Sequence, residues 1–241
     1  MKEPTLGQVT ESQVEGRAPD EEGAAVAVPQ PTWMVVYHSA AFAFSALLSP
    51  YLVIPAGTVA IVASQSSTHQ QFMRWTSWSV FFSTVVPALY VVVQMLRGKI
   101  TDVHVMEREQ RGGPFLTAII SSAVGAGVLH QLDAPVRVWG IGVVLAVNGL
   151  IMLWVSSFWK ISIHVAVLSA TVLAAIVMIQ GVSVWSLVWL VPALIWARVT
   201  RGRHSLLQGV AACVTACVLT GGVMYAINLG PRAMHVLHSI F

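Results

Sequence analysis

Three segments of the chain carry most of the residues that could take part in a reaction. They are residues 99–114, 160–164 and 198–208, and each lies at the end of a long apolar run. Their candidate site residues are the cations, two of the histidines, one serine and one glutamine: Lys99, Arg108, Arg111, Lys160, Ser162, His164, Arg198, Arg201, Arg203, His204 and Gln208. Side chains of these types suit the binding and cleavage of a phosphate group.

Each of these residue types has a role in such chemistry. Guanidinium groups bind phosphate oxygens through pairs of parallel hydrogen bonds, and a lysine adds a point charge. One histidine can attack phosphorus while the other protonates the leaving oxygen. Because cationic side chains can stabilise the charge of the transition state, this chemistry requires neither a metal ion nor another cofactor.

The segment around His204 resembles a motif of the type 2 phosphatidic acid phosphatase and vanadium haloperoxidase superfamily. That family carries three motifs, K-x6-R-P, P-S-G-H and S-R-x5-H-x3-D, and the third is matched at its spacing by Arg198, His204 and Gln208. The resemblance implies that His204 is the nucleophile, that Arg198 binds phosphate and that Gln208 orients His204. Ala197 and Gln208 stand where the family has Ser and Asp, so the orienting residue carries no negative charge.

The other two motifs are matched more loosely, in the family's order. Ser162 and His164 correspond to the second motif, and the resemblance implies a general acid at His164 with Ser162 assisting on a phosphate oxygen. Lys99 begins the first motif, but eight residues rather than six separate it from Arg108, and Arg111 is separated from the following proline by two glycines. The first motif therefore implies phosphate binding by Lys99 and by either Arg108 or Arg111.

Long apolar runs must position these segments. The chain is 56% hydrophobic and 10% charged, whereas soluble domains carry about 25% charged residues. Runs of about 20 apolar residues indicate membrane-spanning helices, so we expect an all-α, polytopic helical bundle of six to seven spans with a phosphatase-like core. Because the first run contains Pro50 and Pro55, we expect one kinked or broken span there. The seven runs are 34–63, 76–96, 115–132, 137–157, 161–181, 183–200 and 205–229.

Counting the spans predicts which loops share a membrane face. The three chemistry-bearing segments are separated by even numbers of spans, so we expect them at one face, with loops 64–75, 133–136 and 181–183 at the other. Most lysines and arginines fall on the first face, which predicts a cytoplasmic N-terminus in a bacterial plasma membrane. The acidic, proline-rich residues 1–32 are expected to form a disordered tail, and residues 33–241 the transmembrane domain.

The favoured hypothesis is a membrane lipid phosphohydrolase that acts through a phosphohistidine intermediate. Its substrate would be phosphatidic acid, phosphatidylglycerol phosphate, or a polyprenyl phosphate or diphosphate. Altered motifs also allow a non-catalytic transporter or lipid-binding protein of the same fold, and Asp102 near Arg108 allows, more distantly, a polyprenyl transferase. Lys160, Arg201 and Arg203 are interpreted as interfacial anchors. Membrane lipids are the expected partners and nucleic acid is not, while homo-oligomerisation stays open.

Overall fold

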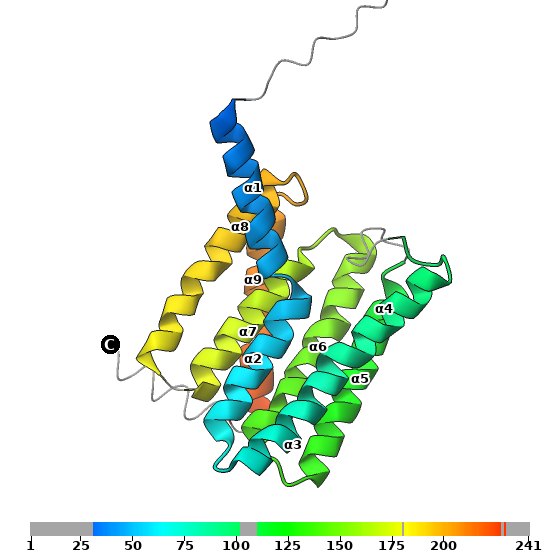
Figure 1. Cartoon of the computed structure of the whole chain (residues 1–241), viewed down its shortest axis with the longest axis vertical. Helices are drawn as coiled ribbons and strands as arrows, with labels where there is room; N and C mark the ends of the chain where they lie inside the picture. Colours follow the sequence, from blue (N-terminus) through cyan, green and yellow to red (C-terminus); the bar gives the residue numbers. More distant parts are fainter. Residues whose placement is uncertain (1–30, 102–109, 180, 228, 230–241) are drawn as a thin grey trace, which may run out of the picture.

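The computed structural model describes residues 31–101, 110–179, 181–227 and 229 of the chain. Within these residues it contains helices and connecting loops but no β-strand, as Figure 1 shows. The elements in chain order are α1 (Thr32–Leu47), α2 (Pro50–Gln65), α3 (His69–Val80), the π-helical turn η1 (Phe81–Val85), α4 (Val86–Leu96), α5 (Gly112–Gln131), α6 (Val136–Phe158), α7 (Ile163–Ile179), the 3₁₀ helix η2 (Val182–Trp189), α8 (Leu190–Thr200) and α9 (Leu206–Ala226).

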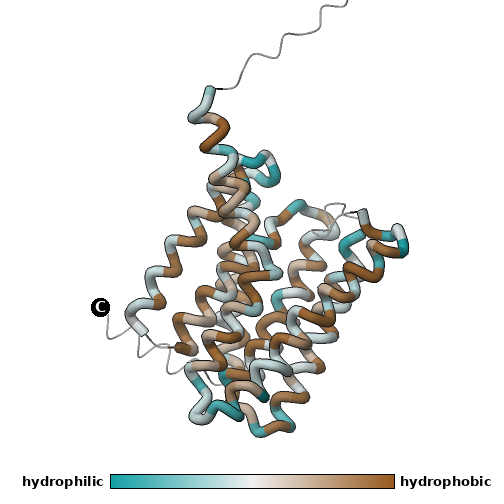
Figure 2. Tube along the Cα trace, viewed as in Figure 1, coloured by the Kyte–Doolittle hydropathy of each residue, from teal (hydrophilic) through white to brown (hydrophobic). Residues whose placement is uncertain are grey.

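The predicted all-α bundle is confirmed. Five helices of the described chain are long and apolar enough to cross a membrane, or six when the bent pair of α1 and α2 counts as one span. Large apolar side chains such as Leu89, Leu150 and Val218 are exposed along the outer faces of the bundle. Figure 2 shows hydrophobic residues along the middle of the helices and hydrophilic residues gathered at their ends. Several long apolar helices with this surface are compatible with an integral membrane protein.

The first span is broken, as its prolines predict. Helices α1 and α2 meet at an angle of 51°. Ser49 has an extended backbone because it precedes Pro50, which starts α2 at a position where the missing N–H needs no partner. A second distortion lies before Pro87, where the N–H of Val86 donates to the carbonyl of Phe81 five residues earlier.

The predicted loop 64–75 is wrong in its second half, because α3 begins at His69. Thr68 caps this helix by accepting a hydrogen bond of 3.2 Å from the backbone N–H of Gln71. The Gln71 side chain in turn accepts from the N–H of Ser67 at 3.0 Å. A Thr-x-x-Gln sequence is a helix-start signal that does not depend on hydrophobicity, so it was missed by a search for apolar runs.

The helices are arranged around α7, most of whose residues are buried. Helix α7 contacts α2, α6, α8 and α9, and its side chains enter both of the large hydrophobic clusters of the core. Figure 1 shows the ends of α4, α6 and α8 and the starts of α5, α7 and α9 at the same end of the bundle. This is the end at which span counting places residues 99–114, 160–164 and 198–208.

Helices α5 and α6 pack closely at Gly142. A Cβ atom added there would lie 2.6 Å from the backbone carbonyl oxygen of Ser122 and 3.0 Å from the Cβ of Ala126. We expect Gly142→Ala to separate these helices and to destabilise the protein by about 1–3 kcal/mol. The temperature of thermal unfolding in detergent measures this loss of stability. Gly127→Ala, where a Cβ would meet nothing within 4 Å, is the control and should not lower the unfolding temperature.

Candidate functional site: a cationic cavity with two histidines

One cavity of about 590 Å³ opens at the end of the bundle where the three segments meet. Its basic and histidine side chains are Arg111 from the first segment, Lys160 and His164 from the second, and four from the third. The basic residues and histidines that line it are Arg111, Lys160, His164, Arg198, Arg201, Arg203 and His204. No Asp or Glu of the described residues lines it. A cavity with this lining favours an anionic ligand.

His204 is held in one orientation by the start of α9. Its Nδ1 lies 3.1 Å from Oε1 of Gln208, and the same oxygen accepts the backbone N–H of Ser205 at 3.2 Å. Ser205 and Gln208 form the capping box of α9. Because a backbone N–H only donates, the Gln208 atom at this position is the oxygen, and Nδ1 of His204 must therefore carry the hydrogen. The lone pair of His204 is then on Nε2.

The surroundings of His204 keep its ring neutral. Partial burial is the largest cause, followed by the charge of Arg198, and together with Lys160 and Arg111 they lower the pKa of His204 to about 4. The hydrogen bond with Gln208 acts in the opposite direction and raises the pKa. At neutral pH His204 is thus an unprotonated imidazole with an available Nε2, which is the state that a nucleophile needs.

Ser45 of α1 joins the third segment to the first span. Its hydroxyl oxygen accepts a hydrogen bond of 2.9 Å from Nη1 of Arg198 and another of 3.2 Å from Nη1 of Arg201. Ser45 is 1% exposed and Arg198 is 7% exposed. The guanidinium of Arg201 also lies over the ring of Phe42, 4.8 Å from its centre. Ser45 therefore fixes the position of two of the cavity's guanidinium groups.

Replacing Ser45 by alanine should weaken phosphate binding. The substitution leaves two guanidinium N–H groups without their acceptor, and a hydrogen bond to a charged group contributes about 1.5–3 kcal/mol. We expect about a tenfold rise in the Kd for inorganic phosphate, measured by isothermal titration calorimetry. Ser64→Ala is the control, because the Ser64 hydroxyl donates to the carbonyl of Ile61 at the far end of α2.

The chain matches no protein-family model, no curated protein and no solved structure. The site is therefore interpreted from its own geometry. The described residues contain no group of three or more His, Cys, Asp or Glu side chains placed to hold a metal ion. What the cavity offers a ligand is cationic hydrogen-bond donors and two imidazoles.

Three predicted site residues do not line the cavity, although one of them, Gln208, contacts His204, which does. Lys99 is exposed after the end of α4 and does not line it. Ser162 is fully buried, and only its neighbours Ile161 and Ile163 line the cavity. Arg108 lies outside the described residues, as do Asp102 and nearly all of the predicted N-terminal tail. Of the two arginines considered for the first motif, the structure places Arg111 at the cavity.

Three residues interpreted as interfacial anchors also line the cavity, namely Lys160, Arg201 and Arg203. Their sequence context is that of ordinary basic residues at span ends, so spacing alone did not separate the two roles. Ser45 was missed altogether, because a single serine in an apolar helix carries no signal of its own. The indicator that exists is indirect: Ser45 falls just before the proline break in the first span.

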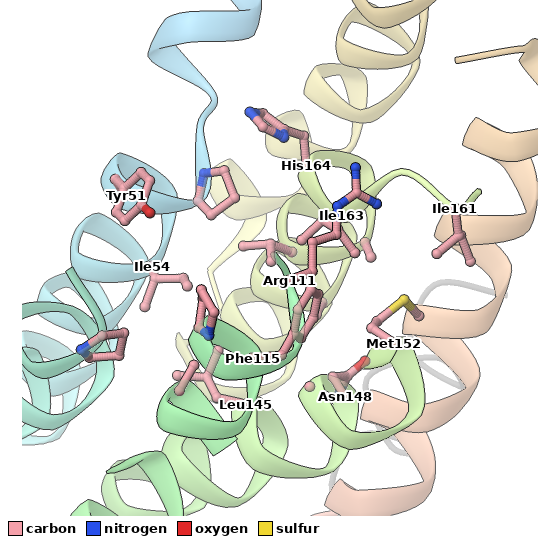
Figure 3. Close-up of a pocket in the computed structure, with 18 of the residues that line it drawn as sticks. Tyr51, Ile54, Arg111, Phe115, Leu145, Asn148, Met152, Ile161, Ile163 and His164 are labelled. Atoms are coloured by element: carbon pink, nitrogen blue, oxygen red, sulfur yellow. The ribbon is translucent and has the colours of Figure 1, made fainter. Parts of the chain in front are cut away.

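The cavity continues from this cationic end into the apolar interior of the bundle. Its deeper walls include Ile54 of α2, Phe115 of α5, and Leu145 and Met152 of α6. Figure 3 shows His164 and Arg111 at one end of the space, with Leu145 and Asn148 at the other. Asn148 donates its Nδ2 to Thr220 of α9 at 3.1 Å and to the carbonyl of Val144. One continuous cavity thus joins a charged mouth to a mostly apolar floor.

Proposed function

We propose that this protein is a metal-independent phosphohydrolase of membrane lipid phosphates that acts through a phosphohistidine. The observation that carries the proposal is that His164 and His204 line one cavity together with Arg111 and Arg198. The orientation of His204 by Gln208, with Nε2 left free, supports the nucleophilic role. The resemblance of the sequence to type 2 phosphatidic acid phosphatases implies the same roles for His164, His204, Arg111 and Arg198, whereas Lys99 and Ser162 do not line the cavity.

The reaction would proceed in two steps. Arg198 and Arg111 bind the phosphate oxygens, and Lys160, Arg201 and Arg203 add positive charge around them. Nε2 of His204 attacks phosphorus, the bond from phosphorus to the ester or anhydride oxygen breaks, and His164 gives that oxygen its proton. His164 then takes a proton from water, whose oxygen attacks the phosphohistidine and releases inorganic phosphate from Nε2 of His204.

The placement of the cavity supports a lipid substrate. Its mouth is at the end of a bundle whose outer faces are apolar, so a phosphate at the membrane surface could reach the cations, and an apolar tail would find apolar surface both outside the bundle and deeper in the cavity. We place this mouth on the cytoplasmic side of a plasma membrane, because the basic residues concentrate at that end. Phosphatidic acid, phosphatidylglycerol phosphate and polyprenyl mono- or diphosphates are the candidate substrates.

Phosphate release by the purified protein tests the proposal. Each candidate lipid is supplied in mixed micelles containing a chelator of divalent cations, and we expect release from at least one of them. Rapid quenching during turnover should trap phosphate on the protein in a form that is stable to base and labile to acid, as expected for phosphohistidine. Absence of release from every lipid, with binding retained, would contradict the proposal.

A second candidate function is binding of a lipid phosphate without turnover. It is favoured by one observation, the neutral Gln208 beside His204, because a carboxylate there would stabilise the cationic phosphohistidine and an amide does not. The same experiment separates the two candidates, since a binding protein would hold the lipid and release no phosphate.

A further inference from the structure

We infer that the apolar tail of the bound lipid phosphate lies inside the helical bundle, and that the cavity floor on α5 and α6 limits the tail length that is accepted. This inference rests on the proposed function, because it assumes that the cationic mouth binds a phosphate group. On this inference, the rest of the cavity binds a single hydrocarbon chain, and residues of the cavity floor determine the length of that chain.

The shape of the cavity is the first argument. Its lining on α5 extends from Arg111 at the mouth to Ser122, and on α7 from His164 to Ala170. At 1.5 Å per residue, these positions are separated by about 16 Å on α5 and about 9 Å on α7. The cavity is therefore far deeper than a phosphate group needs, and its volume of about 590 Å³ is that of a site for a whole small molecule.

The change in lining with depth is the second argument. All the cationic residues of the lining belong to the mouth, whereas Ile54, Phe115, Val144, Leu145 and Met152 form much of the deeper wall. An occupant that fits both parts carries its negative charge at one end and an apolar chain at the other. Asn148 is the most polar residue of the deeper wall; its Nδ2 donates to Thr220 and Val144, while its buried Oδ1 has no hydrogen-bond partner among the described residues.

The floor is the third argument. Leu145 and Ala118 line the deeper cavity from α6 and α5, two helices held together closely at Gly142. Ser122, the last residue of α5 in the lining, is also the residue whose carbonyl oxygen a Cβ at Gly142 would meet, so this close packing of α5 and α6 bounds the cavity. A chain that reaches this boundary gains no further contact from additional methylene groups.

Binding of n-alkyl phosphonates of increasing length tests the inference without any hydrolysis. The affinity of wild-type protein should rise by up to about fourfold per methylene group and then stop rising at one chain length. Ala118→Phe fills the cavity and should move this limit to shorter chains. Leu145→Ala enlarges the floor and should move it to longer chains, so the test does not depend on either variant alone.

Leu150→Ala is the matched control. Leu150 is on the same helix as Leu145 but is 55% exposed on the outer face, so its variant should keep the wild-type limit. An affinity independent of chain length, or a limit unchanged in both cavity variants, would overturn the inference. Failure of the proposed function would look different: phosphonates would still bind with a length limit, but no lipid phosphate would be hydrolysed.

Discussion

Replacing His204 by alanine should reduce phosphate release by about 10³-fold or more, because the variant has no group to accept the phosphoryl unit. Nothing nearby can substitute for it. His164 has the proposed general-acid role at the start of α7, the other charged side chains of the lining are cations, and the Ser45 hydroxyl accepts hydrogen bonds from Arg198 and Arg201. The base-stable phosphoprotein should disappear together with the activity. Steady-state phosphate release and trapping by an alkaline quench measure the two effects.

Two comparisons make the result specific to the nucleophile. His69→Ala removes an exposed histidine at the start of α3, at the opposite end of the bundle, and should keep full activity. Binding of an alkyl phosphonate to the His204→Ala protein should stay within a few-fold of wild type, since the cationic residues that bind the phosphonate are intact. A variant that binds normally and still turns over at the wild-type rate would exclude the phosphohistidine mechanism.

The fold could be predicted from the sequence where hydrophobicity determines it. Apolar runs of about 20 residues located the spans, and their number determined which loops share a face, because a helix can only alternate between the two sides. The helical segment at His69 could not be found in this way, since its first turns are polar and depend on the Thr68–Gln71 cap. The hydrophobic pattern also did not predict which helices pack against each other.

The pairing of α1 with α8 shows why partner choice was not predictable. The indole N–H of Trp196 donates to the hydroxyl of Tyr37 at 2.8 Å, and Thr200 donates to the same oxygen at 3.1 Å. These residues are about 160 positions apart, and both helices are apolar throughout much of their length. Uniform hydrophobicity predicts that the helices pack against apolar surroundings, but it does not specify which helices pack against each other.

The candidate site likewise contains contacts between residues close in the sequence, which could be predicted, and contacts between distant residues, which could not. The His204–Gln208 pair is separated by four residues, one helical turn, so its contact could be expected from spacing alone. The contact of Arg198 with Ser45 joins residues 153 positions apart and depends on the α1–α8 pairing. Whether Lys99 or Lys160 reaches the phosphate position depends on loop conformation, which no spacing rule determines.

Replacing Gln208 by glutamate should move the acid limb of the pH–rate profile upward by about 1–3 pH units. In the wild-type protein the pKa of His204 is about 4, so kcat/KM should fall only as the pH drops through about 4 and the ring becomes protonated. A carboxylate at position 208 favours the protonated ring and raises this pKa. At pH 5 the variant should therefore lose much of its activity, while above pH 7 His204 is neutral in both proteins.

The substitution is conservative in every respect except charge. Glu has the length of Gln, and its carboxylate can still accept both the N–H of Ser205 and Nδ1–H of His204, so the capping box of α9 is kept. Gln71→Glu is the matched control, because Gln71 occupies the equivalent third position of α3 at the far end of the bundle. The pH–rate profile between pH 3.5 and 8 distinguishes the outcomes. If Gln208→Glu leaves the acid limb where the wild type and Gln71→Glu have it, the group that loses activity on protonation is not His204, and the nucleophile must be sought elsewhere in the cavity.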